Sequence, residues 1–286
     1  VNRGSLFTIE LISITNQNFI IEIVGGGAMD IEKDLRPGMD LNPFYFPGGP
    51  VGCLLIHGAN GSPLAMRGMG EYLAAKGLTV RRVRLAGHGT TPEDLATKTW
   101  RDFVASAEEG LRQIQAECPT VFVAGLSMGG VITLYLAARY SFDGAIAMSA
   151  PTTMHDWRLR LAPVMKLFVK FVQTEDVEDL VDQSAAPLSI AYRRVPVAFA
   201  GQFVQLQRQA LASLAKIKMP VLIMQGEHDR TIPPESASYI YTHISSPDKE
   251  LVTFPNSGHV ITIDADHDAV WAKAFEFILQ HVKESI

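Results

Sequence analysis

From residue 51 onward, short apolar runs alternate with longer segments whose apolar residues recur at helical spacing. Continuous apolar runs, such as those within 51–58, 120–125 and 219–229, are typical of strands that are buried on both faces. The segments between such runs, for example 99–118, predict amphipathic helices. Strands that alternate with helices favour a mostly parallel sheet covered by helices on both faces. The pattern therefore predicts an α/β fold.

One long segment does not follow this alternation. Between 151 and about 200, an apolar stretch, an acidic stretch and a second apolar stretch occur without a strand that fits the sheet. We expect this segment to be a cap, an insertion that lies over the ends of the strands. The predicted organisation is an N-terminal extension at 1–41, a core formed by 42–150 and 201–286, and a cap at 151–200. A chain of 286 residues is long enough for one α/β domain with such an insertion.

The N-terminal segment 6–24 is apolar enough to suggest a signal peptide. Glu10 and Glu22 interrupt it, however, and no small-residue cleavage site follows an unbroken apolar core. We expect two strands joined by a turn at 16–18. An alternative is that residues 1–28 lie upstream of a natural start at Met29. No stretch reaches the roughly 18 apolar residues of a membrane span, so we expect a cytoplasmic protein without stable membrane insertion.

Charge and cysteine content exclude some partners and sites. The net charge is −5 and basic residues do not cluster on one predicted face, which argues against a nucleic-acid partner. The densest basic stretch, 81–84, alternates within a predicted strand, and we expect it to form a solvated edge of the sheet. Cys53 and Cys118 are expected to lie in the core and at a helix end, without a disulfide or a metal site.

The chemistry is expected at the carboxyl ends of the strands, where the sites of open α/β sheets form. The polar residues at those ends are His57, His88, Ser127, Asp229 and His259. Ser127 lies in the sequence GLSMG, between a predicted strand and a predicted helix. Glycines two positions before and after the serine permit a sharp turn in which neighbouring backbone leaves no room for side chains. The alternative is a serine that only caps the helix.

A serine hydroxyl needs a base within hydrogen-bond reach, and the base needs a third group that orients it. Asp229 and His259 each follow a later strand, and the order Ser…Asp…His is that of α/β-hydrolases. Other candidates near these positions are less suitable: Glu227 lies too close to the strand end, and two aspartates follow the histidine. These alternatives are Glu227, His228, Asp264 and Asp266.

Acyl transfer also requires hydrogen-bond donors for the oxyanion that develops on the carbonyl oxygen. The backbone N–H of Met128, directly after the serine, is one candidate. The second is the N–H of Ala59, in the glycine-rich loop HGANG that follows the first strand of the sheet. We expect His57 and His88 to brace loops rather than to take part in chemistry.

Five motifs together resemble one protein family. The motifs HGANG, GHGTTPED, GLSMGG, GEHDRTIPPESA and NSGHVI, in this order, resemble the small bacterial carboxylesterases and monoacylglycerol lipases of the α/β-hydrolase superfamily. The resemblance extends from about residue 42 to the C-terminus and implies the α/β-hydrolase fold with a small cap. It implies Ser127 as nucleophile, Asp229 and His259 as its partners, and the N–H groups of Ala59 and Met128 as the oxyanion hole. Family members carry a small cap where 151–200 lies here, but the cap sequence does not match theirs, and residues 1–28 have no counterpart in the family.

The expected function is hydrolysis of carboxylic esters through an acyl-enzyme on Ser127, without a cofactor or a metal. Short-to-medium acyl esters or monoacylglycerols are the expected small-molecule substrates. A carbon–carbon hydrolase, a peptidase, an acyltransferase or a non-catalytic ligand-binding protein remain as alternatives, because one fold hosts many functions. Apolar cap residues would either line an acyl pocket or only pack the cap onto the core: Met154, Trp157, Leu161, Met165, Phe168 and Phe171.

Overall fold

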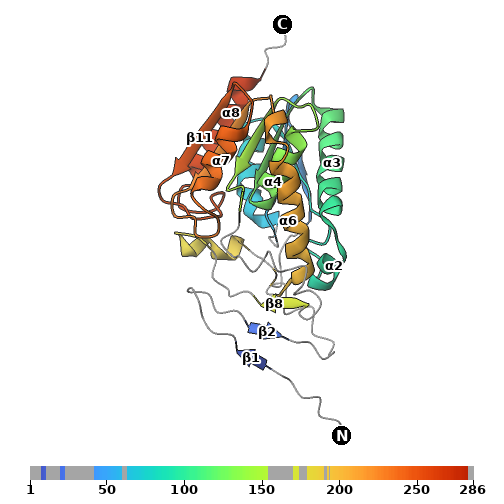
Figure 1. The fold of residues 1–286 in the computed structure, drawn as a ribbon. Helices are drawn as coiled ribbons and strands as arrows, with labels where there is room; N and C mark the ends of the chain where they lie inside the picture. Colours follow the sequence, from blue (N-terminus) through green and yellow to red (C-terminus); the bar gives the residue numbers. More distant parts are fainter. Residues whose placement is uncertain are drawn as a thin grey trace.

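The centre of the computed structural model is a seven-stranded sheet, confirming the predicted α/β fold (Figure 1). The structure describes residues 8–10, 20–22, 42–59, 63–153, 170–173, 179–189, 192 and 194–282. The strand order is β11-β10-β7-β6-β4-β5-β3, and every neighbouring pair is parallel except β3 with β5. The strands are β3 (Phe44–Phe46), β4 (Val51–Ile56), β5 (Thr79–Arg82), β6 (Thr120–Leu126), β7 (Gly144–Met148), β10 (Val221–Gly226) and β11 (Lys249–Phe254).

Helices cover both faces of this sheet. Successive side chains of a strand point to opposite faces, and apolar residues on both faces need to be buried. In β4, Leu54 and Ile56 belong to one hydrophobic cluster, whereas Cys53 and Leu55 belong to the other. The first cluster includes side chains of α3, α4, α6 and α7, and the second those of α1 and α8. The helices are α1 (Arg67–Ala75), α2 (Pro92–Thr97), α3 (Trp100–Glu117), α4 (Met128–Ala137), α6 (Val197–Leu211), α7 (Glu235–His243) and α8 (His267–His281), with short 3-10 helices at Pro63–Met66, Gln183–Leu188 and Leu214–Lys216.

Helix α3 illustrates how local sequence sets the helix ends. The carboxylate of Asp102 accepts a hydrogen bond from the backbone N–H of Thr99 at 2.7 Å, as in a capping box. Pro119 follows the last turn and cannot continue the helix. The predicted helix at 99–118 is therefore confirmed. The loop predicted around His88, in contrast, contains the short helix α2, because Thr91 caps it and Pro92 occupies its first position.

A separate four-stranded antiparallel sheet combines the N-terminal segment with strands from 151–200, the predicted cap. Its order is β1 (Thr8–Glu10), β2 (Ile20–Glu22), β8 (Phe171–Gln173) and β9 (Arg194–Pro196) (Figure 1). The predicted N-terminal pair of strands is confirmed, and its turn lies outside the described residues. The described part of 151–200 adds no strand to the central sheet, as expected. Helix α6 was not predicted, and residue 200 lies inside it.

The basic stretch 81–84 does not form a solvated edge of the sheet, which corrects the prediction. Strand β3 pairs with the outer side of β5, so the edge is β3. The guanidinium group of Arg82 is buried, donates to the carbonyl of Asn42 and lies 4.3 Å from the ring centroid of Phe44. Arg81 forms an ion pair with Glu117 at 2.7 Å. The prediction failed because β3 has only three residues and no clear pattern of its own.

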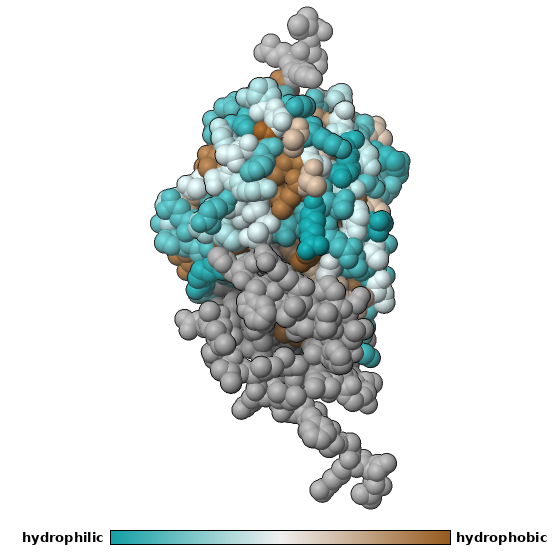
Figure 2. Space-filling view, viewed as in Figure 1, coloured by the Kyte–Doolittle hydropathy of each residue, from teal (hydrophilic) through white to brown (hydrophobic). Residues whose placement is uncertain are grey.

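Both cysteines are buried and free, as predicted. Burial raises the pKa of the Cys53 thiol to about 12, which keeps this thiol protonated and unreactive. Figure 2 shows one face of the molecule, on which hydrophilic residues predominate and hydrophobic residues appear at several places, most clearly near the centre. Among the described residues, no helix has the length and the apolar character needed to cross a bilayer.

Candidate active site

Ser127 occupies a sharp turn between β6 and α4. Its backbone has φ 54° and ψ −117°, in a region that residues other than glycine rarely adopt. Such a conformation costs on the order of 1–3 kcal/mol and persists only where the surroundings enforce it. Although Ser127 precedes the helix, its side chain makes no capping hydrogen bond, so the alternative of a simple helix cap does not describe it.

The two flanking glycines are required by close backbone approaches. A Cβ atom at Gly125 would overlap the carbonyl oxygen of Gly129. At Gly129, it would overlap the carbonyl oxygen of Ile56 in the neighbouring strand β4. The turn is therefore packed against its own helix and against the adjacent strand, and only glycine fits at either position.

Asp229, His259 and Ser127 form one continuous chain of hydrogen bonds. His259 Nε2 lies 2.9 Å from Ser127 Oγ, and His259 Nδ1 lies 2.9 Å from Asp229 Oδ2. Because a carboxylate can only accept, Nδ1 carries the proton and Nε2 is free to accept the serine hydroxyl. The side chains of Asp229 and His259 are 1 % and 10 % exposed. The structure thus brings these three predicted residues together from the ends of three different segments.

The carboxylate of Asp229 is fixed by backbone donors on its own loop. Its Oδ1 accepts from the N–H groups of Thr231 and Ile232, each at 3.0 Å. Oδ2 is thereby left for the histidine. The alternative residues make other contacts or are exposed. Glu227 and His228 are exposed, and Glu227 lies near Thr253. Asp264 accepts from a backbone amide, and Asp266 binds Asn256 and Ser257.

The loop after β4 lies directly beside the serine. A Cβ atom at Gly58 would be 3.3 Å from the Cβ and 3.9 Å from the Oγ of Ser127. Ala59 is the next residue of this loop, and 60–62 lie outside the described residues. Met128 is the first residue of α4, so its N–H belongs to the helix turn whose amides have no intrahelical acceptor. Both predicted oxyanion donors are therefore on backbone that adjoins Ser127.

His57 and His88 form a buried pair that braces two loops. The Nδ1 of His57 donates to the carbonyl of Gly58 at 2.9 Å, while its Nε2 accepts from the N–H of Leu85 at 3.1 Å. The His88 ring lies 5.1 Å from that of His57 and contacts Phe103 and Phe199. Burial lowers the pKa of His57 well below its usual value and that of His88 to about 4. Both rings are therefore neutral supports, as predicted.

Two acidic residues that the sequence did not single out as supports contact the loops of Asp229 and His259. Asp179 accepts from Arg230 N–H and from the hydroxyl of Thr231, at 2.8 and 2.7 Å. Asp264, considered only as a rival of Asp229, accepts from the N–H of Gly258 at 2.7 Å. No local pattern marks Asp179, because its partners lie about fifty positions away in the sequence.

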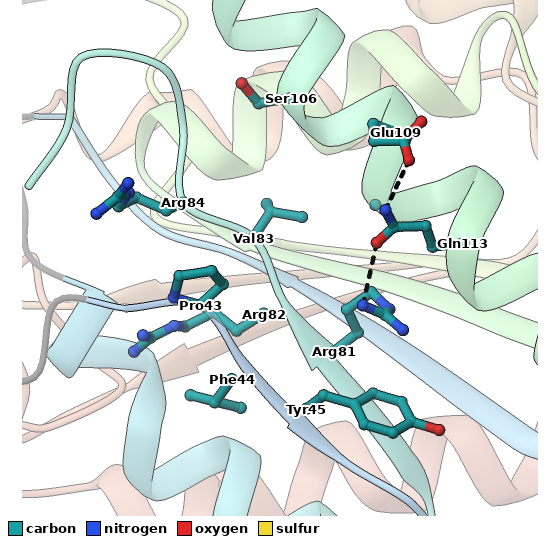
Figure 3. Close-up of a pocket in the computed structure, with 11 residues that line it drawn as sticks. Pro43, Phe44, Tyr45, Arg81, Arg82, Val83, Arg84, Ser106, Glu109 and Gln113 are labelled. Atoms are coloured by element: carbon teal, nitrogen blue, oxygen red, sulfur yellow. Dashed lines mark hydrogen bonds between the residues drawn. The ribbon is translucent and has the colours of Figure 1, made fainter.

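An open cavity of about 440 Å³ lies apart from these residues, between β3, β5 and α3 (Figure 3). In Figure 3, Gln113 bridges Arg81 and Glu109, with hydrogen bonds of 3.0 and 2.6 Å. None of the residues of the Ser127 hydrogen-bond chain lines this cavity. Within the described ranges, no three His, Cys, Asp or Glu side chains are grouped so that they could hold a metal ion.

Most of the apolar cap residues expected near an acyl pocket lie outside the described residues. Phe171, in β8, is described, and its ring lies 4.9 Å from the guanidinium carbon of Arg194 in the neighbouring strand β9. Phe171 therefore packs at least in part within the cap sheet. Its contribution to an acyl pocket stays a prediction, as do those of Met154, Trp157, Leu161, Met165 and Phe168.

Comparison with known proteins identifies the family. Residues 52–266 match the family described as serine aminopeptidase, S33. The chain belongs to this family of α/β-hydrolases. A thermostable monoacylglycerol lipase of Bacillus sp. (strain H-257) is 37 % identical over 84 % of this chain and 94 % of the relative. A carboxylesterase of Bacillus subtilis (strain 168) is 28 % identical over 82 % of this chain and 95 % of the relative.

Two solved structures have a similar fold. One described as belonging to the metagenome-derived lipolytic enzymes LipS and LipT has a TM-score of 0.81 and 32 % identity, covering 86 % of this chain and 99 % of that one. A monoacylglycerol lipase of Paleococcus ferrophilus has a TM-score of 0.72 over 85 % of this chain and 100 % of its own, at 18 % identity. The second likeness supports the fold alone.

Proposed function

We propose that this protein hydrolyses carboxylic esters through a covalent acyl-enzyme on Ser127. The observation that carries the proposal is the hydrogen-bond chain from Asp229 through His259 to Ser127 Oγ, with both links at 2.9 Å. A serine hydroxyl becomes an effective nucleophile when a neutral imidazole accepts its proton and a carboxylate holds that imidazole in place.

In the acylation step, Ser127 Oγ attacks the ester carbonyl carbon while His259 Nε2 takes the hydroxyl proton. The carbonyl oxygen becomes an oxyanion, for which the N–H groups of Met128 and Ala59 are the proposed donors. Asp229 stabilises the imidazolium that forms and remains ionised. His259 then gives the proton to the leaving alcohol as the carbon–oxygen bond breaks, and the acyl group stays on Ser127.

Deacylation repeats these steps with water as the nucleophile. His259 accepts a proton from the water, the hydroxide adds to the acyl carbon, and Ser127 leaves with the proton that His259 returns. The product is the free carboxylic acid.

The proposed substrates are monoacylglycerols or esters of short-to-medium acyl chains. The names of two relatives that align over nearly their whole length, a monoacylglycerol lipase and a carboxylesterase, support this substrate class. The description of the family, serine aminopeptidase, supports peptide hydrolysis as the second candidate. The same serine could serve both reactions, since the chemistry differs mainly in the leaving group.

Turnover of p-nitrophenyl esters of graded chain length, of monoacylglycerols and of aminoacyl p-nitroanilides tests the proposal. We expect hydrolysis of the esters and glycerides and a loss of kcat by about 10⁴-fold or more in Ser127→Ala. Hydrolysis of only the anilides would favour the peptidase. Ester hydrolysis that persists in Ser127→Ala at the wild-type rate would contradict the proposed nucleophile.

A further inference from the structure

A short stretch in the middle of 151–200 contacts the loops that carry Asp229 and His259. Residues 179–182, the return segment, contact both loops through hydrogen bonds. The backbone carbonyl of Asp179 accepts from the N–H of His259 at 2.9 Å. The approach is close enough that a Cβ atom at Gly258 would lie 2.6 Å from this carbonyl oxygen. The return segment therefore packs against the histidine loop with no space between them.

The side chain of Asp179 holds the other loop. Its Oδ2 accepts from the backbone N–H of Arg230 at 2.8 Å and from Thr231 Oγ1 at 2.7 Å. Its Oδ1 pairs with Arg230 Nε at 3.1 Å. Thr231 in turn donates its own N–H to Asp229 Oδ1. One residue thus contacts the acid loop through its carboxylate and the histidine itself through its carbonyl.

Asp264 joins the return segment to the histidine loop a second time. Its buried carboxylate accepts from the N–H groups of Val181 and Asp182 at 2.9 and 2.8 Å, and from that of Gly258 at 2.7 Å. Buried carboxylates are stable when several donors satisfy them. This arrangement fixes the return segment, so that Asp179 is presented to both loops in one position.

We propose that Asp179 is a positioning residue that sets the geometry of the Asp229–His259 pair and couples it to the cap. This inference rests on the proposed function, since it assigns these two residues to the reaction. The side-chain ion pair is not the important contact, because Arg230 is 67 % exposed and exposed ion pairs contribute little. The hydrogen bonds to Arg230 N–H and to the Thr231 hydroxyl carry the effect.

The test compares Asp179→Ala and Asp179→Asn with the matched control Asp182→Ala. The Asp182 carboxylate lies on the same segment but, among the described residues, accepts only from Ser184, in its own 3-10 helix. We expect Asp179→Ala to lower kcat about 10- to 100-fold, because small displacements of reacting groups have large effects, while KM stays within about threefold. Asparagine retains one acceptor oxygen and should restore kcat to within about threefold of wild type. Asp182→Ala should keep the wild-type kcat.

A readout that does not require the substrate separates this inference from the proposed function. The proton in the His259 Nδ1–Asp229 hydrogen bond is followed by proton NMR, and we expect its downfield signal to be lost or broadened in Asp179→Ala only. If the wild type hydrolysed no ester, the proposed function would fail while the NMR result still decided the inference. A wild-type signal and wild-type kcat in Asp179→Ala, or equal losses in Asp182→Ala, would overturn it.

If Asp179→Ala does not fold, Thr231→Val tests the same inference. This change removes the hydroxyl that donates to Asp179 and keeps the backbone N–H that donates to Asp229. We expect a decrease in kcat of about 3- to 10-fold, as for the loss of one hydrogen bond. An unchanged kcat would overturn the proposal.

Discussion

At the scale of single residues, the turn at Ser127 depends on two neighbouring glycines that have no side chain. The serine takes a strained backbone conformation, and its hydroxyl reaches His259 instead of capping α4. Gly125 and Gly129 permit this turn because neighbouring carbonyl groups occupy the space of a side chain. Tight packing around these two glycines therefore holds Ser127 in its strained conformation.

Gly125→Ala should destabilise the protein strongly, because its Cβ would overlap the carbonyl oxygen of Gly129. We expect a loss in the free energy of unfolding of about 2–4 kcal/mol, measured by urea titration. The matched control is Gly201→Ala in helix α6, where no atom of the described residues lies within 4 Å of the new Cβ. That variant should be more stable than wild type by up to about 1 kcal/mol. Similar effects of the two substitutions would contradict the packing described at the turn.

The sequence allowed the residues of the hydrogen-bond chain to be predicted because each follows a strand, and parallel strands end at one edge of a sheet. Ser127 also has a turn motif, and the chain order supports Asp229 and His259. The supporting roles of Asp179 and Asp264 could not be predicted. Their carboxylates accept from backbone N–H groups of distant segments. Because almost every residue has a backbone N–H, the sequence does not show which one will donate.

At the scale of elements, long strands and helices were predictable and short ones were not. Strand β6 and helix α3 have enough residues to show their periodicity. Strand β3 has only three residues, and its pairing with β5 reversed the expectation for Arg82. Helix α6 starts directly after Pro196 at the end of β9, across the predicted boundary at residue 200, and was not predicted.

Tyr192, near the end of the 151–200 segment, is bound to the loop that precedes helix α2. Its hydroxyl accepts from the N–H of Thr90 at 2.7 Å and donates to the carbonyl of Gly87 at 3.0 Å, in a buried position. Tyr192→Phe leaves both backbone groups without this partner, so we expect a loss in the free energy of unfolding of about 1–3 kcal/mol. Urea unfolding measures it. A variant as stable as wild type would show that these two hydrogen bonds do not anchor the end of the 151–200 segment.

At the scale of the whole molecule, the buried pair His57 and His88 makes stability depend on pH. The pKa of His88 is about 4 in the folded protein and about 6.5 when unfolded, because burial disfavours the charged ring. Between these values the unfolded chain binds more protons, so stability rises with pH there and is lost as the pH falls. His57, whose pKa is also lowered by burial, acts in the same direction.

Lowering the pH from 7 to 5 should therefore reduce the free energy of unfolding by about 2 kcal/mol through His88 alone. Urea titrations at the two pH values measure the change. In His88→Asn, which keeps a donor for the carbonyl of Ala86, the loss over this interval should be smaller by that amount. An equal loss in wild type and variant would contradict the assignment of a neutral, buried His88.

Covalent trapping of Ser127 tests the central claim most directly. An alkyl fluorophosphonate resembles an ester at its reacting centre, and attack by a serine oxygen expels fluoride and leaves a stable adduct on that serine. Incubation of the intact protein followed by peptide mapping with mass spectrometry identifies the modified residue. We predict a single adduct on Ser127, none in Ser127→Ala, and much slower labelling in His259→Ala. An adduct on another residue, or labelling of Ser127 at an unchanged rate in His259→Ala, would contradict the proposed mechanism.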